Sequence, residues 1–161
     1  MPATQDHRIV EALASLGLVL PAAPKPVASY IPSVRSGNLL FVSGQLPFKD
    51  GNLIATGRVG AEVTLETAQA CVRQCVLNGL AVVRGACDGS LDGVVRIVRL
   101  GVFVACTEGF GDQPKVANGA SDLLQQLFGD AGRHARAAVG TNALPLNACV
   151  EVEMLVELAS A

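Results

Sequence analysis

The C-terminal run CVEVEMLVELA carries three carboxylates at alternate positions of an expected strand. Glu151, Glu153 and Glu157 share one parity, and apolar side chains hold the other. Because successive side chains of a strand point to opposite faces, one face is predicted to join the core and the other to carry carboxylates. The simplest interpretation is a solvated sheet face. The alternative is a cleft in which neighbouring carboxylates separate in pKa, so that one Glu accepts a proton near neutrality.

A small basic cluster stands at the entrance of the strand expected over residues 135–142. Arg133, His134 and Arg136 lie together there. A guanidinium group can hold a carboxylate through two parallel hydrogen bonds, so Arg136 is a candidate for gripping an acidic substrate. An ordinary surface arginine is the competing interpretation. Tyr30 is the only tyrosine, and its hydroxyl needs a partner if the side chain is buried.

The five cysteines are predicted to be packed thiols. Cys71 and Cys75 would share one helix face, but two His and no second Cys pair leave a metal site short of ligands. Free cysteine is among the most buried residue types. A cysteine nucleophile would need a nearby histidine, for which His134 is the only credible candidate. Phosphate-loop, nucleotide-binding, GxSxG and HExxH motifs do not occur in the sequence, so we expect neither a metal nor another cofactor.

The elements that position these residues alternate between helices and short strands. Helices are expected over residues 7–18, 65–83 (after a Thr64 N-cap) and 115–128, and strands within 27–43 and over 94–105, 135–142 and 149–158. The first helix is expected to pack through Ile9, Val10, Leu13, Leu16 and Leu18, and PAAPKP follows it as a Pro-stiffened connector. Residues 35–38 and Asp50-Gly51 are expected to reverse the chain. This order predicts an α+β fold with two helices covering one face of a mostly antiparallel sheet.

Composition narrows the classes of function. Half of the 161 residues are apolar and only 16% are charged, which excludes intrinsic disorder and favours burial of apolar surface between subunits. The net charge is −2, Lys and Arg form no run, and only 4% of the residues are aromatic, so no nucleic-acid partner is expected. No apolar stretch approaches the ~18 residues of a membrane span. With an odd number of cysteines favouring a reducing compartment, we expect a soluble cytoplasmic protein without a membrane partner.

Three stretches resemble the YjgF/RidA family, also called the endoribonuclease L-PSP family. They are SYIPSVRSGNLLFVSGQLP at residues 29–47, VRLGVFVACTEGF at 98–110, and HARAAVGTNALPLNACVEVEM at 134–154. The resemblance covers most of residues 27–158. It implies a chorismate-mutase-like (ferredoxin-like) α+β fold that assembles as a homotrimer with clefts between subunits. Residues 1–161 then form a single domain, in which residues 1–26 are an N-terminal helical extension and linker.

The same resemblance implies an activity and a site. Archetypal members are 2-iminobutanoate/2-iminopropanoate deaminases, which hydrolyse reactive imino or enamine acids to 2-keto acids and ammonia without a metal or a covalent nucleophile. The family's essential arginine falls on Arg136 and its strand glutamate on Glu151, as the catalytic pair. The residues implied to bind substrate, a small carboxylate-bearing metabolite, are Arg136, Tyr30, Ser43, Gly44 and Asn118.

Two other functions stay open at this point. The scaffold could serve as a non-catalytic, carboxylate-binding regulatory homotrimer that uses Arg136 without turnover. Departures from the family pattern favour keeping this alternative, because Ala138 stands where some members carry Cys and the loop at residues 107–113 is longer. The older family name adds an endoribonuclease, against which the anionic chain and the scarcity of aromatic side chains argue.

Overall fold

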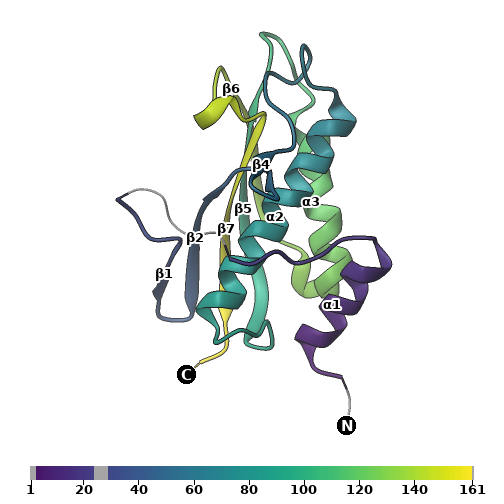
Figure 1. Ribbon diagram of the computed structural model, residues 1–161. Helices are drawn as coiled ribbons and strands as arrows, with labels where there is room; N and C mark the ends of the chain where they lie inside the picture. Colours follow the sequence, from purple (N-terminus) through teal and green to yellow (C-terminus); the bar gives the residue numbers. More distant parts are fainter. Residues whose placement is uncertain (1–2, 24–28, 161) are drawn as a thin grey trace.

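One five-stranded sheet organises the chain in the computed structural model, which describes residues 3–23 and 29–160. The strands lie in the order β1-β2-β7-β5-β6 (Figure 1). Their bounds are β1 Ser33–Ser36, β2 Leu39–Gln45, β7 Val150–Leu158, β5 Val94–Ala105 and β6 Ala135–Thr141. The β5–β6 pair is parallel and the other three pairs are antiparallel. The mostly antiparallel sheet predicted from the sequence is therefore confirmed, with the apolar 94–105 run at an interior position.

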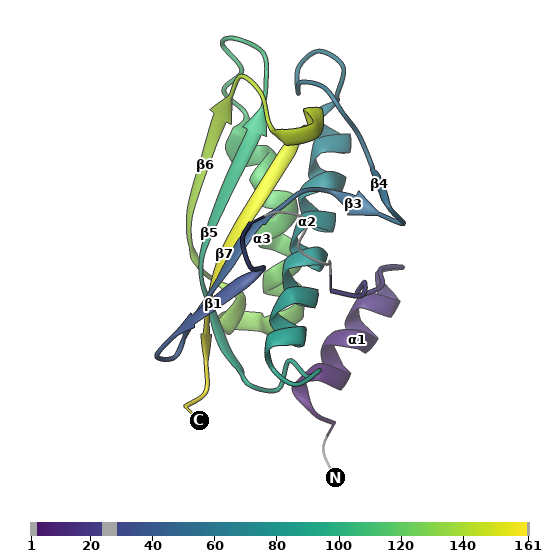
Figure 2. The same cartoon turned by 60° about the vertical axis from the view of Figure 1, so that its left-hand side comes forward.

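The helices cover a single face of the sheet, as Figure 2 shows. They are α1 Gln5–Ser15, α2 Leu65–Ala86 and α3 Gln113–Phe128, with short 3₁₀ turns η1 Gly129–Gly132 and η2 Pro145–Asn147. The predicted N-cap is confirmed, because the Thr64 hydroxyl accepts a hydrogen bond of 3.1 Å from the Thr67 amide. The core fills the layer between α2, α3 and the sheet, where Val72, Leu100 and Val152 are fully buried.

The N-terminal helix packs by a narrower face than its sequence predicts. Ile9 and Leu13 are buried, whereas Val10 and Leu16 are exposed. The helix lies beside α3 and the C-terminal end of α2 (Figure 1), and this contact covers only the side that carries positions 9 and 13. Residues 24–28, on which most of the expected PAAPKP connector falls, lie outside the described part of the chain.

Polar contacts fasten α1 to the rest of the molecule. The Asp6 carboxylate pairs with the Arg84 guanidinium at 2.9 Å and accepts a hydrogen bond of 3.0 Å from the Leu91 amide. The Gln5 side-chain amide donates to the carbonyls of Leu91 and Val94, at 2.8 and 2.9 Å. The first helix is thereby anchored to the turn between α2 and β5.

Both predicted chain reversals are present. The β1–β2 hairpin closes through Gly37 and Asn38, since Ser36 is the register partner of Leu39. A second hairpin joins β3 Phe48–Lys49 to β4 Asn52–Leu53, and both residues of its Asp50-Gly51 loop have positive φ, 51° and 82°. Two left-handed residues are what a tight hairpin turn of this kind demands.

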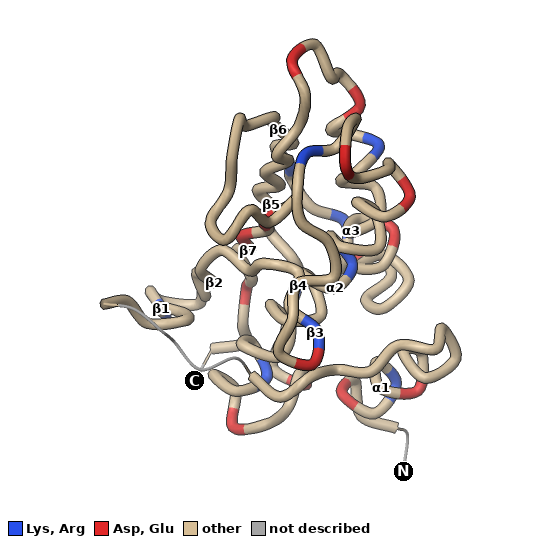
Figure 3. The backbone as a smooth tube through the Cα atoms, turned by 45° about the horizontal axis from the view of Figure 1, so that its top comes forward, with Lys and Arg blue, Asp and Glu red and all other residues tan. Residues whose placement is uncertain are grey.

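The charged side chains are distributed along the whole chain. Figure 3 shows Lys and Arg interspersed with Asp and Glu rather than gathered on one segment. Among the described residues, no helix combines the length and the apolar character needed to span a bilayer.

Candidate functional site

The two faces of β7 differ as its alternation predicts. Val150, Val152, Met154 and Val156 are buried toward the helices, while Glu151 and Glu153 occupy the face that the helices leave open. The predicted parity is confirmed. The glutamates therefore project from a face bordered by β2 on one side and β5 on the other.

A β-bulge lies beside Glu151. On β2 the register runs from Val42, opposite Met154, to Gln45, opposite Val152. Ser43 and Gly44 together therefore face the single residue Glu153 of β7. Bulges of this kind are common next to functional sites because they redirect side chains. Here the bulge brings the bare backbone of Gly44 against the Glu151 side chain.

Gly44 is required by the position of the Glu151 carboxylate. A Cβ atom at Gly44 would collide with Glu151 Oε1 and come within 2.8 Å of its Cδ. The carboxylate thus occupies the space that a side chain at position 44 would fill. Burial, and to a smaller extent the charge of Glu153, raises the pKa of Glu151 above that of an ordinary glutamate. A carboxyl group with a raised pKa is suited to proton transfer.

Ser43 ties the segment that carries Tyr30 to β2. The Ser43 hydroxyl donates to the Ile31 carbonyl at 3.0 Å, and its amide donates to the Pro32 carbonyl at 2.9 Å. The Tyr30 side chain is 51% exposed. Because the side chain is not buried, its hydroxyl can be solvated by water and needs no partner within the protein. We call Ser43, Gly44 and Glu151 the glutamate cluster, to which the segment of Tyr30 is linked through the Ile31 carbonyl.

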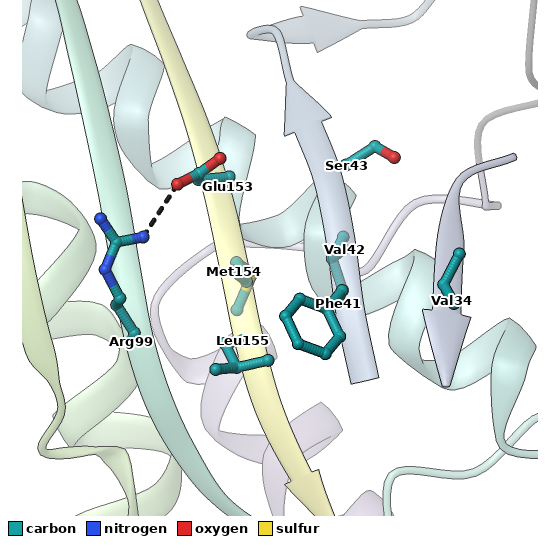
Figure 4. A pocket seen from close by; sticks show the side chains of 8 residues that line it. All are labelled: Val34, Phe41, Val42, Ser43, Arg99, Glu153, Met154 and Leu155. Atoms are coloured by element: carbon teal, nitrogen blue, oxygen red, sulfur yellow. Dashed lines mark hydrogen bonds and ion pairs between the residues drawn. The ribbon is translucent and has the colours of Figure 1, made fainter. Parts of the chain in front are cut away.

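A shallow groove of about 360 Å³ continues this open face toward the hairpin. Figure 4 shows the residues that line the groove. The apolar side chains of Phe41 and Leu155 project from neighbouring strands, and the Arg99–Glu153 ion pair lies at one side. The Arg99 guanidinium donates to Glu153 Oε1 at 2.8 Å. The backbone of Gly101 leaves room for this pair, since a Cβ there would lie 2.5 Å from Glu153 Oε1.

Arg136 belongs to a second group of polar side chains at the β6–α3 edge. Its Nη1 donates to Asn118 Oδ1 at 2.9 Å and to Ser121 Oγ at 3.0 Å. The Ser121 hydroxyl also lies 3.0 Å from His134 Nε2, and His134 Nδ1 lies 2.6 Å from the Gly132 carbonyl. We call Arg136, Asn118, Ser121 and His134 the arginine cluster.

The arginine and glutamate clusters lie on opposite faces of the sheet. Arg136 is the register partner of Leu100, which is buried under the helices. Glu151 is the register partner of Phe103, whose own β6 partner Val139 faces away from the helices and is 47% exposed. Within one chain, Arg136 contacts Asn118, and Glu151 lies against Gly44, the neighbour of Ser43 in the bulge. The predicted catalytic pair does not converge in one copy of the chain.

The model of the YjgF/chorismate mutase-like endoribonuclease family matches residues 8–158. The chain belongs to the YjgF/RidA family. Protein TCP17 of Trypanosoma cruzi is 46% identical over 159 residues, which are 98% of this chain and 99% of that protein. A 2-iminobutanoate/2-iminopropanoate deaminase of Dermatophagoides farinae is 29% identical and covers 84% of this chain and 91% of its own length.

A solved structure confirms the chorismate-mutase-like fold of this YjgF/RidA protein. Protein Atu1372 of Agrobacterium tumefaciens, of unknown function, superposes with a TM-score of 0.91 at 44% identity. The superposition covers 96% of this chain and 94% of that one. The fold class expected from the sequence is therefore shown.

Two residues of this YjgF/RidA protein's candidate site, Ser121 and Arg99, were not predicted from the sequence. Ser121 follows Asn118 by three positions on α3, and helical spacing alone places both on one face. Ser121 could therefore have been predicted as a neighbour of Asn118. Arg99 was not accessible, because its pairing with Glu153 depends on the register between β5 and β7.

The cysteines are unpaired thiols that are buried or half-buried, as expected. Cys71, Cys75 and Cys149 are fully buried, and Cys87 and Cys106 are half-buried. A hydrogen bond with Cys149 and burial raise the pKa of the Cys71 thiol, and burial raises that of Cys75. Protonated thiols are poor nucleophiles, and Cys149, whose pKa is lowered by the hydrogen bond with Cys71, is fully buried. Both ring nitrogens of His134, the candidate activator of a cysteine, are engaged by Ser121 and Gly132 instead.

Proposed function

We propose that this protein is a deaminase of 2-imino and enamine acids, acting in clefts between the subunits of a homotrimer. The observation that carries the proposal is the arginine cluster. Two partners hold one nitrogen of an exposed guanidinium and leave its other N–H groups available to a carboxylate. The relative from Dermatophagoides farinae, a 2-iminobutanoate/2-iminopropanoate deaminase, supports the choice of reaction.

The chemistry needs few groups. Arg136 binds the substrate carboxylate and orients the imine. The imine carbon is already electrophilic, so water can add to it directly. Glu151 takes a proton from this water as the C–O bond forms and passes it to the imine nitrogen, which gives a neutral carbinolamine. Glu151 then carries the hydroxyl proton of the carbinolamine to its nitrogen while the C–N bond breaks, which releases ammonia and the 2-keto acid. Tyr30 and Ser43 line the glutamate side of the cleft.

The placement of the two clusters supports a site shared between copies. Since Arg136 and Glu151 project from opposite faces of one sheet, a ligand that meets both needs one cluster from each of two subunits. The open face carries exposed apolar side chains, Val34 at 51%, Phe41 at 48% and Val139 at 47%, which a neighbouring subunit would cover. The resemblance to the family supports an assembly of three subunits. The five free thiols suit a reducing compartment, and we propose the cytoplasm.

One observation favours a second candidate function. The arginine cluster is complete within a single chain, so a carboxylate can be bound without Glu151. A regulatory trimer that binds a small carboxylate and releases it unchanged would need no more than this. We do not favour an endoribonuclease, because the cationic side chains are interspersed with acidic ones (Figure 3) instead of forming a track for phosphates.

A coupled assay separates these functions. A threonine dehydratase generates 2-iminobutanoate in situ, and its decay is followed with and without the protein. We expect faster decay with wild type and with Arg133→Ala, and no acceleration with Arg136→Ala. Arg133 is the matched control, since it lies three residues away and its side chain pairs only loosely, at 3.6 Å, with Asp130.

The outcomes are exclusive. Acceleration that survives Arg136→Ala would remove the carboxylate-binding role of Arg136. No acceleration with small, branched and aromatic imino acids, together with saturable binding of 2-ketobutyrate, would establish the regulatory trimer instead. Sedimentation velocity of the wild type tests the three-subunit assembly independently.

A further inference from the structure

We infer that Ser121 and His134 are positioning residues, which aim the Arg136 guanidinium through a directed hydrogen-bond chain ending at the Gly132 carbonyl. Neutral His134, protonated at Nδ1, orients the Ser121 hydroxyl, and Ser121 and Asn118 together hold Nη1 of Arg136. The inference rests on the proposed role of Arg136 in binding a substrate carboxylate. It adds Ser121 and His134 to that site and assigns the His134 ring one protonation state, neutral with the hydrogen on Nδ1.

The direction of the chain follows from what each group is able to do. A guanidinium only donates, so Ser121 Oγ must accept from Arg136 Nη1 at 3.0 Å. The hydroxyl hydrogen of Ser121 is then free to point at His134 Nε2, also at 3.0 Å. An accepting Nε2 carries no proton, which puts the hydrogen of the neutral ring on Nδ1. Nδ1 then donates to the Gly132 carbonyl at 2.6 Å, a partner that only accepts.

The surroundings favour the neutral ring. Burial lowers the pKa of His134, and the nearby charge of Arg136 lowers it further, against the opposing effect of the hydrogen bond to Gly132. At neutral pH the imidazole therefore keeps an unprotonated nitrogen for Ser121. Protonation would turn Nε2 into a donor facing a hydroxyl that already accepts from Arg136.

Local structure holds the end of the chain in place. Asn118 and Ser121 lie three residues apart on α3, so both face β6. Immediately after α3, the η1 turn folds back so closely that a Cβ at Gly132 would collide with the Leu124 carbonyl. A glycine at this position lets the turn lie against the helix and present its carbonyl to His134.

The arrangement has a consequence for the ligand. Asn118 and Ser121 engage both hydrogens of Arg136 Nη1. Nε–H and the two hydrogens of Nη2 remain, and Nε with Nη2 forms a side-on fork that matches the two oxygens of a carboxylate. Without Ser121, one of the two contacts that set this plane is lost, and the guanidinium can rotate about its long side chain. Ser121 and His134 are thus expected to affect ligand binding more than the chemical step.

Binding and kinetics of variants test the positioning role. The probe is 2-ketobutyrate, the product of the proposed reaction, measured by calorimetry, alongside KM and kcat for 2-iminobutanoate. We expect Ser121→Ala and His134→Phe to weaken binding and raise KM roughly 10- to 100-fold, with kcat changed much less. Ser121→Thr keeps the hydroxyl and should restore most of the affinity. Ser15→Ala, at a helical serine whose hydroxyl donates to its own helix at Glu11, is the control.

A spectroscopic measurement tests the chain without ligand or variants. Long-range ¹H–¹⁵N correlation of the wild-type imidazoles at neutral pH should show His134 as the Nδ1–H tautomer. Detection of the Nε2–H tautomer or of a charged ring would overturn the inference, whatever the protein binds. Circular dichroism and thermal melting check that each variant is folded.

The two hypotheses fail in different ways. If Arg136→Ala binds 2-ketobutyrate as well as wild type does, the proposed function is wrong. If Arg136→Ala loses binding while Ser121→Ala and His134→Phe keep wild-type affinity, the carboxylate-binding role of Arg136 stands and the positioning role is wrong.

Discussion

On β6, the Arg136 guanidinium is held by two side-chain hydrogen bonds, whereas on β7 the Glu151 carboxylate lies over the bare backbone of Gly44. The arginine cluster is positioned by directional contacts from α3. The glutamate cluster is positioned by shape, through a bulge and an absent side chain. The first arrangement fixes the plane of a cation that must meet two oxygens, and the second partly desolvates an acid that must exchange a proton. Each means of positioning suits the task proposed for the group it holds.

The largest expected effect concerns the proton-transfer role of the glutamate cluster. Glu151→Gln removes the proposed base while keeping the size of the side chain. We expect imine hydrolysis to fall by roughly 10²- to 10⁴-fold, the range that general acid–base catalysis supplies. Binding of 2-ketobutyrate should change little, because the carboxylate contact belongs to Arg136. Glu157→Gln, on the same face of β7, is the control, and comparable turnover in both variants would refute the assignment.

Gly44→Ala should cause the second-largest loss of activity. The new Cβ must displace the Glu151 carboxylate, with which it would collide, while β2 remains paired. A displacement of about 1 Å can cost roughly 100-fold in rate, so we expect a loss of this order in kcat at unchanged secondary structure. Gly93→Ala enters open space and serves as the control. Wild-type turnover in Gly44→Ala would show that the exact place of the carboxylate is unimportant.

A smaller effect concerns pH. The charge of Glu153 contributes to raising the pKa of Glu151, so Glu153→Gln should lower that pKa. A base with a lower pKa stays ionised to lower pH, and the acidic limb of the kcat/KM profile should move toward acid. Arg99→Met, which leaves Glu153 without its ion-pair partner, should move the limb the other way. Shifts in the same direction for both variants would contradict this account.

The smallest expected effect is on stability. A carboxyl whose folded pKa is raised binds its proton more tightly in the folded state, so its contribution to stability is lost as pH rises through that pKa. At pH 7 the ionised Glu151 therefore opposes folding. Glu151→Gln should unfold at a slightly higher denaturant concentration than wild type at pH 7, and the difference should vanish near pH 4. A variant less stable than wild type at pH 7 would contradict the sign.

Much of the fold was predictable from local patterns. The Thr64 cap, the Asp50-Gly51 turn and the alternation along β7 each follow from the preferences of a few neighbouring residues, and the structure confirms them. The N-terminal helix was predicted as well, but with too wide an apolar face. Its packed side is set by its contact with α3 and α2, which the sequence of the helix does not contain.

The sequence by itself determined which faces of the strands are apolar and which residues carry charge, because side-chain alternation is a property of each strand alone. Only the tertiary structure decided that Arg136 and Glu151 point to opposite faces. That outcome depends on the registers of β6 and β7 with β5, which are set by long-range packing. The partners of Arg136 also depend on tertiary structure. Ser121 on α3 reaches Arg136 and His134 only because α3 packs against the start of β6.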